Sequence, residues 1–145
     1  MLFTITVITI LAYWIMGKDV SKLVEELKDF DFTGKINQLL DKVRPWALKA
    51  GRVATRPLLL FYYVMENDNL STLDRILIYA AILYTISPMD ALPRAIYKFI
   101  GVLDDGVAVV FVYNKIKSKI TPEIEVKVDH VLNDWFGVEY TAING

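Results

Sequence analysis

Three aspartates have the spacing that could support metal or acid–base chemistry. Asp90, Asp104 and Asp105 are the only acidic residues between Asp74 and Glu123, and they lie in two turns between apolar segments. If those segments form helices that pack antiparallel, the three carboxylates meet. Carboxylate oxygens bind Mg²⁺ or Ca²⁺, and neighbouring carboxyl groups shift one another's pKa as acid–base catalysis requires.

A structural role explains the same aspartates. Each precedes or opens an apolar segment, where a helix amino terminus needs a hydrogen-bond acceptor and favours negative charge. We rank helix capping first for these residues, a cation or lipid-linked site second and catalysis third. Arg94 favours an internal ion pair with Asp90 or Asp104 over a metal site.

Cysteine is absent and histidine occurs once, which limits the kinds of catalytic and metal site that the chain can form. The chain has no cysteine, which excludes thiolate nucleophiles and cysteine-ligated metal sites, and His130 is its single histidine. His130 and Asp134 have the spacing of a surface pair on one helix. Phosphate-binding glycine loops and serine-hydrolase motifs are absent. We therefore expect no cofactor, and scaffolding or interaction rather than catalysis.

Residues 35–56 form a basic segment. They contain six basic residues against one acidic residue, a charge of +5 in a chain whose formal net charge is −1, so the remainder carries −6. On a helical plot the apolar side chains share one arc, and the opposite side carries the lipid headgroup candidates Lys35, Lys42, Lys49, Arg52 and Arg56.

Such a segment can lie on an anionic membrane surface, or it can be the solvated face of a bundle helix. Nucleic acid is not expected as a partner, because no aromatic platform or known binding motif accompanies the cations. Pro45 predicts a kink or break near Arg44.

The amino terminus is strongly apolar. Residues 2–16 contain no charge, and as a helix they would extend about 22 Å against a hydrocarbon core of about 30 Å. Tyr13 and Trp14 followed by Lys18 have the order of an interfacial anchor whose carboxyl side is cytoplasmic. We predict a membrane anchor with the bulk of the chain on the cytoplasmic side. The alternative is a buried helix or strand of the core.

Apolar periodicity and capping signals predict an all-α fold, a small helical bundle with an amino-terminal hydrophobic helix. We divide the chain into a hydrophobic segment (2–16), amphipathic helices (18–56), a helical domain (57–136) and a tail (137–145). Hydrophobic residues make up 54% of the chain, and Ile76 to Ile86 is apolar on nearly every side, so we expect it at the bundle centre.

Capping signals mark the predicted helix ends. Ser71 and Asp74 form a capping-box-like start, and Thr121 followed by Pro122 starts the last helix, which Gly137 ends.

An ordered motif then connects two apolar helices. It comprises Tyr84, Ser87, Pro88, Asp90, Pro93, Gly101, Asp104, Asp105 and the turn Thr121-Pro122-Glu123. In this pattern the chain resembles, over roughly residues 58–124, the YkvA-like family, domain of unknown function 1232. The resemblance implies a small helical domain, mostly bacterial and commonly membrane-associated, with no established activity. Arg94 departs from the family, which usually has an aspartate there.

The sequence thus favours a membrane-associated helical scaffold or interaction module whose partner is membrane lipid. A protein partner or a second copy of the chain is also considered. Two alternatives stay open: a soluble cytosolic bundle, and a cation-dependent membrane enzyme that uses Asp90, Asp104 and Asp105.

Overall fold

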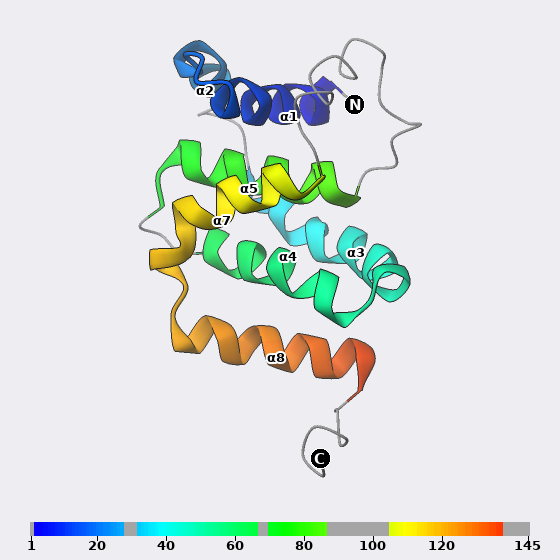
Figure 1. The fold of residues 1–145 in the computed structure, drawn as a ribbon. Coiled ribbons are helices and arrows are strands. Elements are labelled where there is room, and N and C mark those ends of the chain that lie inside the picture. Colours follow the sequence, from blue (N-terminus) through cyan, green and yellow to red (C-terminus); the bar gives the residue numbers. More distant parts are fainter. Residues whose placement is uncertain (1, 28–31, 67–69, 87–104, 138–145) are drawn as a thin grey trace.

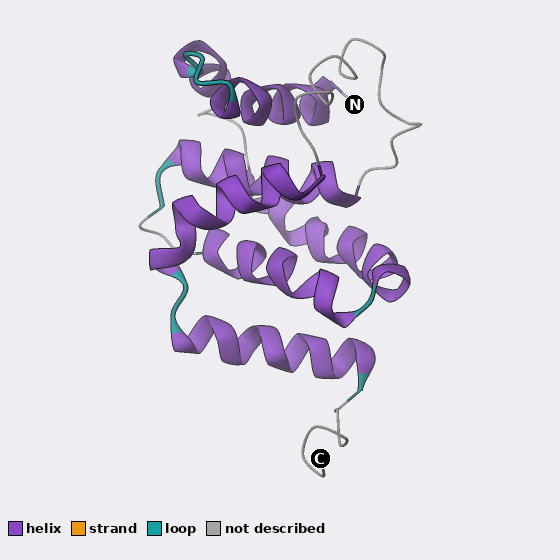
Figure 2. Ribbon diagram, viewed as in Figure 1, coloured by secondary structure: helices purple, strands orange, loops and turns teal. Residues whose placement is uncertain are grey.

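The computed structural model describes residues 2–27, 32–66, 70–86 and 105–137. Within these ranges the chain is all-α, as predicted, with seven α-helices and no strand (Figure 2). The elements are α1 (Leu2–Ile15), α2 (Ser21–Leu27), α3 (Phe32–Ala50), α4 (Arg52–Met65), α5 (Thr72–Ile86), α7 (Asp105–Ile116), the 3₁₀ turn η2 (Lys117–Lys119) and α8 (Pro122–Phe136).

Four of these helices stack in the order α1, α5, α4, α8, so that α1 and α8 lie at opposite ends (Figure 1). Helices α3 and α7 each pack on both α4 and α5. Every residue from Ile76 to Tyr84 in α5 is buried. This confirms its predicted place at the bundle centre, because a helix that is apolar all round must be surrounded by other elements.

Helix α1 corrects the prediction of a spanning anchor. It has only 14 residues, and no helix in the described ranges is long and apolar enough to cross a membrane. Val7, Ile8, Ile10, Leu11 and Ala12 are buried, and α1 packs mainly on α5. The apolar run therefore forms a helical core element, the alternative considered above.

The basic segment forms two helices, and the break is not where we predicted it. Helix α3 continues through Pro45 to Ala50, and the chain turns at Gly51, whose φ of +100° suits glycine. Pro45 deprives the carbonyl of Asp41 of its helical partner. Both residues lie on the exposed side of α3, where water can hydrogen-bond that carbonyl.

The turn at Gly51 is held by its own hydrogen bonds. The Gly51 N–H donates to the Ala47 carbonyl (2.8 Å), and the buried Thr55 hydroxyl donates to the Gly51 carbonyl (2.7 Å). The first bond closes the last turn of α3 and the second lies at the first turn of α4, so both helix ends at this corner have hydrogen-bond partners.

Capping residues act as predicted at three helix ends. The Ser71 hydroxyl accepts from the Asp74 N–H (3.1 Å), and the Thr121 hydroxyl accepts from the Ile124 N–H (3.3 Å). Gly137 ends α8 with φ of +83°. Each signal is local, which explains why it could be recognised without knowledge of the packing.

Candidate functional site

Most residues of the motif between α5 and α7 lie outside the described residues. Asp90 and Asp104 are among them, as are Ser87, Pro88, Pro93 and Gly101. Helix α7 begins at Asp105, and Tyr84 is buried in α5. Within the described ranges, no group of three or more His, Asp or Glu side chains could hold a metal ion.

The cations of α3 form an exposed basic face. Lys35, Lys42 and Lys49 are exposed and recur every seven residues, so they follow one line along the helix. Arg44 is exposed on the same helix, and Asp41 is the one exposed acidic residue of α3. The positive potential predicted from the sequence is therefore directed to solvent along this helix.

Two aliphatic side chains stand out at the end of this face. Leu48 is 55% exposed and Val53 is 88% exposed, and they lie on either side of Gly51, where α3 turns into α4. We call this surface the basic corner and define it by Lys42, Arg44, Leu48, Lys49 and Val53. Sequence analysis missed the two aliphatic residues, although Leu48 lies one turn after Arg44 and thus on the same side of the helix as that arginine.

The two arginines of α4 have a different environment from the lysines of α3. The Arg52 guanidinium donates to the Asn133 side-chain oxygen (2.7 Å) and to the Gly137 carbonyl (3.2 Å). Arg56 forms an ion pair with Asp129. The five predicted headgroup residues therefore split into three exposed lysines and two arginines that bind α8.

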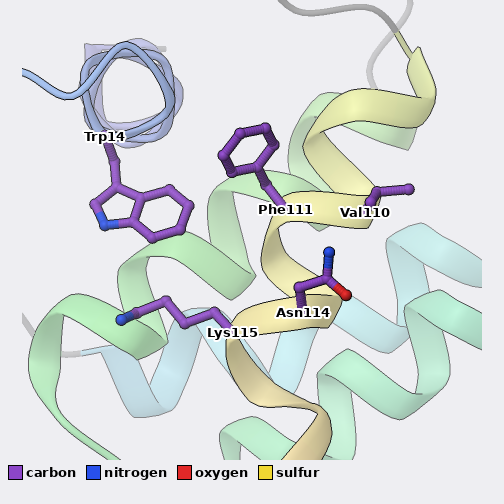
Figure 3. A pocket seen from close by; sticks show the side chains of 5 residues that line it. All are labelled: Trp14, Val110, Phe111, Asn114 and Lys115. Carbon is purple, nitrogen blue, oxygen red and sulfur yellow. The ribbon is translucent and has the colours of Figure 1, made fainter.

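A groove between α1 and α7 is the second surface feature. It has a volume of about 420 Å³ and is lined by Trp14, Val110, Phe111, Asn114 and Lys115 (Figure 3). Trp14 and Phe111 meet edge to face with ring centroids 5.9 Å apart. The Lys115 Nζ lies 5.4 Å from the centre of a Trp14 ring.

The charge in this groove is already matched. Lys115 Nζ lies 3.4 Å from Asp74 Oδ1, and the Asp74 side chain is only 16% exposed. Asp74 Oδ1 accepts no hydrogen bond, so the ammonium is what compensates its burial. Asp74 thus faces Lys115 instead of completing the capping box predicted from the sequence. The groove offers an aromatic surface but no acid–base pair.

Family comparison bears on part of this arrangement. Residues 74–111 match the model of a family described as a protein of unknown function, DUF1232. The chain is similar to this family over that stretch. The match confirms the resemblance and lies within the residues 58–124 that suggested it. No curated protein and no solved structure matches the chain.

The DUF1232 segment, residues 74–111, has a defined place in the fold. It includes most of α5, the first part of α7 and, among the residues in or near the groove, Asp74, Val110 and Phe111. The basic corner and α8 lie outside it. The family match therefore accounts for the central helix of the bundle and carries no information about the cationic surface.

Proposed function

We propose that the protein is a helical interaction module that binds the surface of anionic membranes through the basic corner, at the cytoplasmic face. The proposal depends on one observation: Leu48 and Val53 are exposed around the turn from α3 into α4, in the same segment that exposes Lys42, Arg44 and Lys49. Transfer of aliphatic side chains from water to the headgroup boundary lowers the free energy, and nearby cations are attracted to anionic lipids.

The charge distribution supports one orientation on such a surface. Residues 35–56 carry +5 and the rest of the chain carries −6. An anionic surface therefore attracts α3 and repels most of the remaining molecule. This binding would be peripheral and sensitive to salt, because charges farther apart than about 10 Å are screened at 0.1 M salt.

The first experiment measures cosedimentation of the full chain with vesicles. Vesicles of phosphatidylcholine alone should bind little, and vesicles with 30% phosphatidylglycerol should bind the protein in a salt-dependent way. The variant Lys42→Gln/Arg44→Gln/Lys49→Gln should bind about 100-fold more weakly, since each basic residue near the surface contributes about 1 kcal/mol.

A matched control separates the corner from net charge. The variant Lys22→Gln/Lys117→Gln/Lys119→Gln removes the same number of charges from other parts of the chain. It should retain most of the binding. Equal losses in the two triple variants would show that the corner is not the binding surface, and no binding of the intact chain would refute the proposed function.

The aliphatic contribution needs its own variant. Leu48→Ser/Val53→Ser keeps every charge of the corner and removes its two exposed apolar side chains. We expect this variant to bind several-fold more weakly than the intact chain. The loss should be the same at raised salt, because the apolar contribution that is removed is not screened. An unchanged affinity would mean that attraction is purely electrostatic.

A further inference from the structure

Helix α8 is attached to the bundle by few buried side chains. Only Val128 and Leu132 are buried in its 15 residues, and they pack with Leu59 and Leu60 of α4 in a small cluster. Among the described elements α8 packs on α4 and, less extensively, on α3 (Figure 1). It is the outermost layer of the stack at that end.

Polar contacts set the position of α8 on α4. Along the antiparallel pair, Lys127 Nζ lies 5.9 Å from the centre of the Tyr63 ring, Asp129 pairs with Arg56, and Asn133 accepts from Arg52. Arg52 also donates to the Gly137 carbonyl at the carboxyl end of α8, where the helix dipole favours a cation.

The same two arginines adjoin the basic corner. Arg52 precedes the exposed Val53, and Arg56 follows one turn later on α4. A guanidinium binds phosphate oxygens with the same N–H groups that it uses for carboxylate or amide oxygens. A lipid phosphate that binds the Nη groups of Arg52 and Arg56 therefore competes with Asn133 and Asp129 for them.

The negative charge of α8 disfavours its approach to an anionic surface. The helix carries Glu123, Glu125, Asp129 and Asp134 against the single cation Lys127, a formal charge of −3. A surface that attracts the corner repels this helix. Headgroup binding and α8 docking then oppose each other, and such coupling is reciprocal.

From these contacts we propose that α8 is an intramolecular competitor of lipid headgroups for Arg52 and Arg56. Docked α8 holds both arginines and lowers the affinity of the corner; on an anionic membrane α8 undocks from α4 and releases them. This inference rests on the proposed membrane function, of which it is the regulation.

Two aspartates of α8 provide a matched test. Asp129→Ala removes the partner of Arg56, whereas Asp134→Ala makes the same charge change at an exposed position of the same helix. With vesicles containing 30% phosphatidylglycerol, we expect Asp129→Ala to bind about fivefold more tightly than the intact chain and Asp134→Ala to differ by less than twofold. Asn133→Ala, which removes one acceptor of Arg52 without a change of charge, should also tighten binding.

Hydrogen exchange gives a readout that does not depend on the variants. In the intact chain, addition of the vesicles should accelerate amide exchange in residues 122–136 and leave α5 unchanged. If the intact chain binds but exchange in α8 stays the same or slows, or if the two aspartate variants bind equally tightly, the competition is refuted while the proposed function stands. If neither the intact chain nor Asp129→Ala binds, both proposals are wrong.

Discussion

Helices α1 and α8 lie at opposite ends of the stack and are held there in different ways. Helix α1 packs on α5 through Val7, Ile8, Ile10, Leu11 and Ala12, all of them buried. Helix α8 buries fully only two side chains, and partly buried apolar side chains together with charged and amide groups complete its contact with the bundle. One end of the bundle is thus an extension of the core, and the other is a contact that water and ions can replace.

Buried apolar side chains and surface ion pairs typically differ in how much free energy they contribute to stability. A fully buried Leu or Ile side chain contributes about 1.5–3 kcal/mol through removal of its surface from water. An ion pair at the surface contributes about 0–1 kcal/mol, and the Arg56 and Asp129 side chains are 40% and 52% exposed. Undocking of α8 exposes fewer fully buried side chains than removal of α1, so we expect it to require less free energy. The bundle should open first at its α8 end.

The largest effect is expected at the α1 end. Leu11→Ala creates a cavity against α5 and should lower the free energy of unfolding by about 2–5 kcal/mol. Urea denaturation followed by circular dichroism should show a lower midpoint with the whole bundle unfolding together. A Leu11→Ala protein of unchanged stability would mean that α1 is not part of the core.

A smaller and more local effect is expected at the α8 end. Leu132→Ala weakens the cluster with Leu59 and Leu60, and we expect a cost of about 2 kcal/mol, the low end for such substitutions, because an outer helix can shift to fill the space. Hydrogen exchange should accelerate in α8 while α5 keeps its protection. Equal acceleration in both helices would contradict the comparison between the two ends.

The smallest effect concerns the start of α8. Thr121→Ala removes the acceptor for the Ile124 N–H and should cost about 1 kcal/mol, whereas Thr121→Ser should retain most of the stability. Amide exchange at the first turn of α8 reports this directly. If Thr121→Ala also destabilises α1, the ends of the bundle are coupled more strongly than their contacts indicate.

Local signals allowed much of the fold to be predicted. Periodicity indicated the all-α class, and Ser71, Thr121 and Gly137 marked helix ends that the structure confirms. The apolar stretch from Ile76 to Ile86 predicted the bundle centre, and Ile76 to Tyr84 are buried there. Each inference depends on residues within one or two helical turns, which is why a single sequence was sufficient.

The sequence was less informative about which distant segments pack against each other and where the chain turns. The run in residues 2–16 was compatible with lipid or with a protein core, and only the proximity of α5 decided for the core. Pro45 was expected to kink or break the helix near Arg44, whereas the helix continues to Ala50 and the chain turns at Gly51. Neither outcome can be derived from spacing, because it depends on which groups face water.

The basic segment, residues 35–56, shows most clearly which properties follow from the sequence and which depend on the tertiary structure. The sequence by itself determined that residues 35–56 carry +5 and that their cations lie opposite the apolar arc of a helix. Only the tertiary structure decided that Lys42 and Lys49 face solvent while Arg52 and Arg56 bind α8. The physical reason is that a charge is a property of one residue, whereas its compensation depends on an acceptor that the fold brings from about 70 or more residues away.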